Sequence, residues 1–238
     1  MALAKKHGKK YVHAVAAYNP NQFYIPAEGI KALRAVNYVK FDATVEIHMK
    51  LGVDPRHADQ NVRGVTQLPA GTGKVKKVLV FALGDKAVEA ENAGADYVGV
   101  DEYIKQIDDG WFDFNTAIAT PDMMQRISKI ARKLGPRGLM PNPKNGTVTM
   151  DVAQAVKDVK AGRVEFRVDK TGLIHVPIGK MSFTDEQLQQ NLSALLNDIV
   201  RAKPTGAKGQ YVQSITICST MSPGVKLELA SALSMKAN

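Results

Sequence analysis

Strand-like segments of two kinds occur in this chain, and they occupy different parts of the sequence. Residues 40–52, "KFDATVEIHMKLG", alternate apolar and polar side chains, which predicts a strand with one buried face. Residues 75–83, "VKKVLVFAL", form a nearly continuous apolar run, which is typical of a strand covered on both faces. The two patterns predict two different sheets, and the length of 238 residues allows two domains.

The middle of the chain, residues 72–160, alternates predicted strands and helices. Three strands, each followed by a helix, indicate a parallel sheet covered by helices. The third helix is expected over 121–134, because Thr120 suits the N-cap, Pro121 the first turn and Gly135 the end. Its expected buried stripe consists of Met123, Ile127, Ile130 and Leu134.

The N-terminal part contains one predicted strand of the half-buried kind. Residues 1–20 are basic and weakly patterned, which suggests a flexible arm or a loosely held helix. Residues 26–39 have helical spacing and precede the strand at 40–52. Residues 53–74 are polar and rich in turn residues, so we interpret them as a connection.

The C-terminal part returns to the half-buried pattern. The turn "DKTG" at 169–172 between two alternating runs predicts a hairpin, and 211–220 predicts a further strand. Between them, 182–203 is a predicted helix with Thr184 and Gln187 as a capping box.

A single strand cannot form a stable sheet, so the N-terminal strand needs the C-terminal ones. We therefore expect an α/β protein of two domains. One is an antiparallel-sheet domain assembled from residues 1–71 and 161–238, and the other is an α/β domain inserted at 72–160.

Composition restricts the class of partner. The net charge of +9 favours an acidic partner, either nucleic acid or an anionic membrane surface. The apolar runs are shorter than the ~20 residues of a membrane span, so we expect no membrane partner. The single cysteine, Cys218, is interpreted as a small core residue, and its being alone fits a reducing cytoplasm.

Motifs for enzymatic chemistry are missing from the sequence. "AGTGK" at 70–74 lacks the Ser or Thr of a phosphate-binding loop and precedes a strand, and "VLVFAL" is not followed by a dinucleotide-binding glycine pattern. The five histidines lack metal-ligand spacing and cysteine partners, and His48 and His175 lie in strand patterns. We expect no catalytic residues, metal, cofactor or small-molecule substrate.

Basic and polar side chains gather instead at strand ends and loops, where they suit RNA. Lysines can contact phosphate, hydroxyls can contact phosphate or the 2′-OH, and Phe or Met can contact a sugar or base. Each residue also has a structural interpretation: Phe41 as core, "DKTG" as an ordinary turn, and "MSPG" as an ordinary loop. The candidate RNA-binding residues are Lys40, Phe41, Thr44, Lys170, Thr171, Ser214, Thr220, Met221 and Ser222.

A loop rich in Gly and Pro, "GPRGLMPNPKNG" at 135–146, follows the predicted helix of the middle domain. Arg137 and Lys144 make it a candidate for secondary RNA contacts. A purely structural role for the loop is an equal alternative.

Five stretches in order, "VKFDATVEIHMKLG", "DPRHADQNVRG", "GPRGLMPNPKNGTVT", "FRVDKTGLIHVPIGK" and "ICSTMSPG", resemble the bacterial form of the large-subunit ribosomal protein L1 family. The resemblance runs from about Ile25 to the C-terminus. It implies a split β-α-β domain that carries the RNA surface, with the candidate residues above at matching positions, and a Rossmann-like three-layer inserted domain.

The resemblance also implies a function. It implies a cytoplasmic, ribosomal protein that binds ribosomal RNA at the mobile lateral stalk, assists release of deacylated tRNA from the exit site, and represses translation of its own mRNA. Two positions depart from the family pattern: Ser222 replaces a glycine, and Val168 replaces an asparagine.

Two other functions stay open. A nucleotide-using enzyme built on 72–160 would bind a small ligand saturably, although the phosphate motifs are missing. A free RNA chaperone or repressor would bind RNA without sedimenting with large ribosomal subunits.

Overall fold

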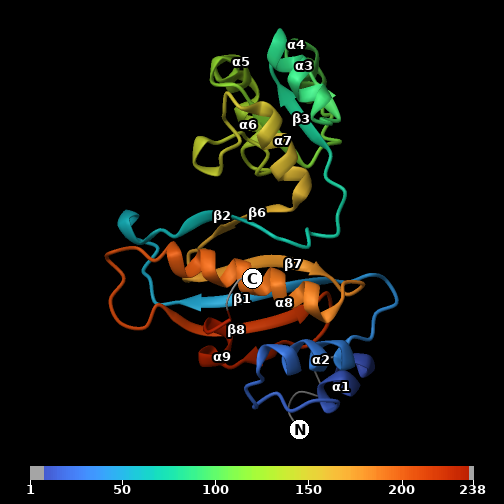
Figure 1. Ribbon diagram of the computed structural model, residues 1–238, viewed down its shortest axis with the longest axis vertical. Helices are drawn as coiled ribbons and strands as arrows, with labels where there is room; N and C mark the ends of the chain where they lie inside the picture. The colour runs from blue at the N-terminus through green and yellow to red at the C-terminus, as the bar shows by residue number, and fades with distance from the viewer. Residues whose placement is uncertain (1–7, 236–238) are drawn as a thin grey trace. The chain divides into compact units, whose positions relative to one another are not determined.

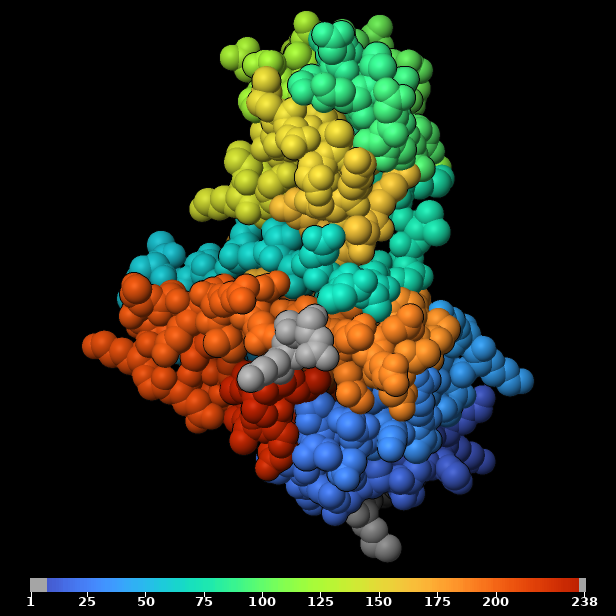
Figure 2. Space-filling model, in the orientation of Figure 1, coloured from blue at the N-terminus to red at the C-terminus, as the bar shows by residue number. Residues whose placement is uncertain are grey.

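The computed structural model describes residues 8–235 and divides the chain into two units. The split unit contains the described residues up to Gly73 and from Val164 onward, and the inserted unit is Lys74–Arg163. Within the split unit, segments from the two ends of the chain lie side by side, blue against orange and red in Figure 2.

The main sheet of the split unit has the strand order β7-β1-β8-β9, and its first three strands are labelled in Figure 1. The central strand β1 (Thr44–Leu51) pairs antiparallel with β7 (Leu173–Lys180) and with β8 (Val212–Ser219). The short strand β9 (Val225–Leu227) pairs antiparallel with β8. Both ends of the chain therefore contribute to one sheet, as the alternating patterns require.

One face of this sheet is buried under helices. On β1, Val45, Ile47 and Met49 are fully buried and belong to a core that also contains residues of α2 (Pro26–Val36) and α8 (Asp185–Arg201). The alternate β1 side chains are only partly buried. We call the sheet face that carries them the open face.

The long helix α8 is fixed by both of its predicted features. Thr184 and Gln187 form the capping box, and one side of the helix is buried in the core. The buried amide of Asn191 accepts from Ala70 N (2.9 Å) and donates to the carbonyls of Gly71 (2.9 Å) and Ile178 (2.7 Å). This side chain therefore ties α8 to β7 and to the segment that leads into the inserted unit.

The predicted hairpin around 169–172 is wrong. The strand before the turn, β6 (Arg163–Arg167), pairs with β2 (Arg63–Gln67) in a separate two-stranded sheet, and β7 pairs with β1. The β2 strand lies within residues 53–74, which we interpreted as a polar connection. That interpretation was therefore only partly correct. Its pairing with β6 satisfies backbone groups that a loop would leave to water.

Shorter elements complete the split unit, and the sequence pattern did not resolve them. They are α1 (Lys9–Ala16), the 3-10 turn η2 (Ala58–Gln60) and α9 (Leu229–Leu233). The expected N-terminal arm is thus partly helical, and its residues 1–7 lie outside the described residues.

The inserted unit contains a three-stranded parallel sheet in the order β4-β3-β5. Side chains of β3 alternate between two cores: Val78 and Val80 face one, and Leu79 and Phe81 face the other. Helices cover both faces, which explains the continuous apolar run. The strands and helices are β3 (Val78–Phe81), α3 (Asp85–Asn92), β4 (Tyr97–Val98), α4 (Asp101–Asp108), β5 (Thr116–Ala119) and α7 (Val152–Ala161).

The helix predicted over 121–134 is a series of short turns. These are η3 (Pro121–Met123), α5 (Met124–Ile127), η4 (Ser128–Ile130) and α6 (Ala131–Leu134). Ile127, Ile130 and Leu134 are buried as expected. The Ser128 hydroxyl donates to the Gln125 carbonyl at 2.6 Å, and such a bond competes with the helical ladder.

The fold class expected from the sequence is confirmed: an α/β protein with an antiparallel sheet built from both chain ends and an inserted parallel sheet. Among residues 8–235, no helix is both long and apolar enough to span a bilayer.

Candidate RNA-binding interface

The candidate residues of the split unit form two groups at opposite ends of β1. The first group surrounds Thr44, where β8 ends, and the second surrounds Lys50, where β7 begins. Six residues of strand separate these ends, which corresponds to about 20 Å. The open face joins the two groups, so they form the ends of one surface.

At the first end, the hydroxyl of Thr220 contributes to the sheet itself. Thr44 N donates to Thr220 Oγ1 (3.1 Å), and Thr220 N donates to the Thr44 carbonyl (3.0 Å). Lys180, which the sequence did not single out, donates through Nζ to Thr44 Oγ1 at 3.1 Å. Thr44 and Thr220 therefore position the ends of β1 and β8 as much as they offer hydroxyls to a ligand.

The loop after β8 presents an apolar side chain. Met221 is 65% exposed and has a φ of 71°, a left-handed conformation that few residues other than glycine adopt. The Tyr38 hydroxyl donates to the Met221 carbonyl at 2.7 Å, which helps to hold this conformation. Phe41, on the loop before β1, is 56% exposed, so its interpretation as a core residue is wrong. Lys40 beside it is exposed.

Ser222, where the family pattern has glycine, closes this loop. Its Oγ accepts from Ser219 N (2.9 Å) and donates to the Pro223 carbonyl (3.1 Å). Its hydroxyl therefore has backbone partners within the loop. Val168, the second departure, is buried in the core, so its side chain is withdrawn from the surface.

At the second end, Asp169 organises the turn that carries the exposed residues Lys170 and Thr171. Its Oδ1 accepts from the backbone N–H groups of Thr171 and Leu173, each at 2.8 Å, and its carboxylate also accepts from the Thr171 hydroxyl. These hydrogen bonds lower the pKa of Asp169 to about 2. Lys50 Nζ donates to the Thr171 carbonyl and fixes the turn against β1.

Ser214 is exposed on β8 and lies opposite Lys50 in the strand register. Strand pairing therefore places Ser214 beside Lys50, whose Nζ contacts the turn that carries Lys170 and Thr171. Lys50, the charged residue that accompanies Ser214 on the sheet, was missed because its position depends on strand pairing.

Between the two ends, the open face carries residues that sequence reasoning did not assign to the site. They are Glu46, His48, His175, Thr216, Cys218 and Lys226. Lys226 lies 5.9 Å from the ring centroid of the exposed Phe23, which adds a cation and an aromatic ring to this surface.

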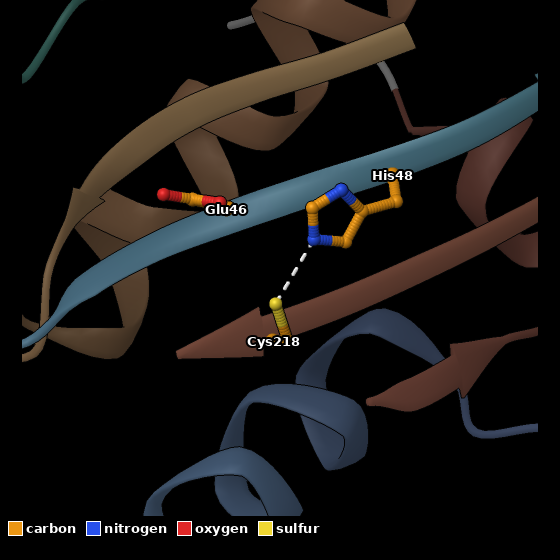
Figure 3. A group of neighbouring side chains, drawn as sticks. All are labelled: Glu46, His48 and Cys218. Carbon is orange, nitrogen blue, oxygen red and sulfur yellow. Dashed lines mark hydrogen bonds between the residues drawn. The ribbon is translucent and has the colours of Figure 1, made fainter. Parts of the chain in front are cut away.

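The interpretation of Cys218 as a core residue is wrong. It is half-buried on the open face, and its Sγ lies 3.0 Å from His48 Nε2 (Figure 3). The buried neighbours Ile215, Ile217 and Ser219 have the opposite parity in β8, a signal that was present in the sequence. Burial raises the pKa of Cys218 to about 11, so the thiol is neutral at physiological pH.

The loop 135–146 of the inserted unit has a fixed backbone path. Asn142 Oδ1 accepts from Lys144 N (2.9 Å), and Arg163 Nη2 donates to the Asn145 carbonyl (2.6 Å). Arg137 is exposed, with its Cζ 3.9 Å from the Phe112 ring centroid, and Lys144 is also exposed. Both cations are therefore available at the surface.

Gly73 of "AGTGK" has a packing role in the split unit. A Cβ on Gly73, whose φ is 69°, would lie 2.7 Å from Lys180 Cγ and 2.9 Å from the Phe183 ring. A strand rather than a helix follows this segment, so the helix N-terminus that a phosphate loop requires is replaced by β3.

Comparison with known proteins gives two findings. The model of the ribosomal protein L1p/L10e family matches residues 33–223. The large ribosomal subunit protein uL1 of Chloroflexus aggregans (strain MD-66 / DSM 9485) is 56% identical over 234 residues, which covers 97% of this chain and 99% of that protein.

Proposed function

This chain belongs to the ribosomal protein L1 family of structural, non-enzymatic proteins of the large ribosomal subunit, and we propose that it binds ribosomal RNA, at the mobile lateral stalk, through the open face of its split unit. The surface extends from the Thr44 end of β1 to the Lys50 end. The observation that carries the proposal is that the open face of β1 runs from Thr44, beside the first group of candidate residues, to Lys50, beside the second.

The charge and chemistry of this surface suit RNA. Exposed or half-exposed lysines border it at both ends and can neutralise phosphates. Exposed Phe41 and Met221 at one end and Phe23 near β9 offer apolar contacts to bases or sugars. The cations are Lys40, Lys50, Lys170, Lys180 and Lys226.

Charge reversal on the two faces of the split unit tests the proposal. We expect Lys40→Glu and Lys170→Glu each to weaken binding of a large-subunit rRNA stalk fragment. The slope of log affinity against log salt concentration should also become shallower, by about the contribution of one phosphate contact. The matched control is Lys31→Glu on α2, which is exposed on the helical side of the same unit. An equal loss of RNA affinity in all three variants would mean that net charge alone attracts the RNA, and it would refute the proposed binding face.

The same face is proposed to bind the protein's own mRNA and thereby repress its translation. A single RNA surface makes the two ligands mutually exclusive. An unlabelled fragment of the messenger should therefore displace the labelled rRNA fragment completely, and Lys170→Glu should weaken both complexes. Simultaneous binding of both RNAs would contradict a shared surface.

We also propose that the inserted unit assists release of deacylated tRNA from the exit site, through Arg137 and Lys144. Their loop is held by internal hydrogen bonds, so the two cations are presented without a large ordering cost. Arg137→Glu combined with Lys144→Glu should slow tRNA release from ribosomes that carry the variant, with unchanged binding of the rRNA fragment. Unaltered release would refute this role for the loop.

A further inference from the structure

Three side chains with metal-binding chemistry converge on the open face. Glu46 and His48 alternate on β1, and Cys218 lies directly opposite Glu46 on β8 (Figure 3). One potential ligand atom from each lies within 4.8 Å of the others, and all three residues are partly buried. Ligand atoms around a tetrahedral zinc ion are about 3.3–3.7 Å apart, so small side-chain movements would complete the site.

His48 is already oriented as a metal ligand would be. Its Nε2 faces Cys218 Sγ at 3.0 Å, and its Nδ1 lies 2.7 Å from Nδ1 of His175 on the neighbouring strand β7. In the arrangement in which the Cys218 thiol donates to Nε2, the proton of His48 lies on Nδ1 and is donated to His175. A metal-binding histidine characteristically donates its second N–H to a carboxylate, a backbone carbonyl or water, which fixes its ring and its tautomer, and His175 occupies the corresponding place here.

Asp169, in the turn at 169–172, lies near His175. When His48 donates to His175, the proton of His175 lies on Nε2, which is 3.8 Å from the Asp169 carboxylate, too far for a hydrogen bond but close enough for an electrostatic attraction. The contact between His175 and His48 therefore helps to hold the His48 ring with its Nε2 toward Cys218.

We propose that Glu46, His48 and Cys218 bind a divalent transition-metal ion of the zinc class, with His175 as the positioning residue. Thiolate, imidazole and carboxylate together suit zinc better than magnesium or calcium, which prefer oxygen ligands. Three protein ligands leave the fourth position to water or an external donor. The inference stands on these contacts and is independent of the RNA-binding proposal, although the site lies on the same face.

Binding changes the protonation of one group. The Cys218 thiol loses its proton to solvent as the S–metal bond forms, while Nε2 of His48 exchanges the S–H donor for the metal. One proton is therefore released from the thiol for each ion bound.

The test uses the full-length, reduced, metal-free protein, with Zn²⁺ followed by calorimetry and Co²⁺ by absorption. We expect one ion per chain and a thiolate-to-Co²⁺ charge-transfer band. Cys218→Ser should abolish the band and weaken Zn²⁺ binding at least about 10-fold, and Glu46→Gln should weaken binding while the band persists.

His175→Ala should lower affinity about 10- to 100-fold and retain the charge-transfer band, as expected for a positioning residue. The control is His57→Ala, which removes an exposed histidine elsewhere in the split unit and should leave affinity unchanged. Thermal unfolding without metal verifies that each variant is folded. No stoichiometric binding, or binding that Cys218→Ser leaves unchanged, would overturn the proposal.

Discussion

Replacement of Met221 by glycine should move stability and RNA affinity in opposite directions. Met221 has a φ of 71°, and it is the non-glycine residue with positive φ among residues 8–235. A left-handed conformation costs a residue with a Cβ about 1–2 kcal/mol relative to glycine. Such strain persists where the surroundings enforce it, as the hydrogen bond from Tyr38 does here, and it is often found at functional sites.

The expected stability gain is modest because glycine also gives the unfolded chain more freedom. Relief of about 1–2 kcal/mol is offset by about 0.4–1 kcal/mol from the unfolded state, which leaves a net stabilisation of about 0–1.6 kcal/mol, centred on about 0.8 kcal/mol. In a unit of this size that corresponds to a rise in melting temperature of about 1–4 °C.

RNA affinity should fall because the variant lacks the exposed side chain. Full burial of a methionine side chain is worth about 1.5–3 kcal/mol. With 65% of Met221 available, its loss should cost about 1–2 kcal/mol, or roughly 5- to 30-fold in the dissociation constant.

Thermal unfolding by circular dichroism and titration with the rRNA fragment measure the two effects. Met221→Ala should lose the same affinity without the stability gain, because alanine keeps the strained Cβ. Met150→Ala, at a 55% exposed methionine of the inserted unit, should alter neither property. Wild-type affinity in Met221→Gly would refute the contact, and a loss of stability would refute the account of strain.

Three further predictions concern stability. Asn191→Ala should destabilise the split unit by about 2–4 kcal/mol, measured by urea unfolding. The reason is that the buried Ile178 carbonyl and the half-buried Ala70 N–H and Gly71 carbonyl lose their partner. The same change at the half-exposed Asn197 should have little effect on stability. The depressed pKa of Asp169 stabilises the fold above the unfolded value of 3.8, and this contribution disappears as pH falls toward about 2. The stability difference between wild type and Asp169→Asn should therefore shrink over that range, and a constant difference would contradict it. Residues 74–163 expressed alone should unfold cooperatively by fluorescence of the single tryptophan, Trp111, if the unit is a domain, whereas a noncooperative transition would argue against it.

The local pattern of apolar and polar residues was sufficient to predict the strands and helices in which that pattern repeats regularly. The alternation in β1 and β8 and the capping box of α8 specify these elements directly. The sequence pattern does not say which strands pair with one another. The turn at 169–172 is held by hydrogen bonds to Asp169, as a hairpin turn would be, but β6 pairs with β2, which lies far away along the chain. A five-residue strand such as β2, with few apolar residues, has little signal of its own.

The candidate site was predictable to a similar degree. The residues at the two ends of the open face were named from residue type, position and family resemblance. The side chains between them, including His48 and Cys218, come together only through the register of β1 against β7 and β8. Ser222 and Thr220 were named for their hydroxyls, and the backbone partners of these hydroxyls became visible only in the structure.

The most direct measurement is titration of the full-length protein against a stalk fragment of large-subunit rRNA at several salt concentrations, beside an unrelated hairpin. The account predicts tight binding of the stalk fragment that persists at moderate salt, with a linear decline of log affinity against log salt. It also predicts at least about a thousand-fold preference over the hairpin. Equal binding of both RNAs, abolished together by moderate salt, would mean that the net charge of +9 alone attracts RNA and would contradict a specific binding face.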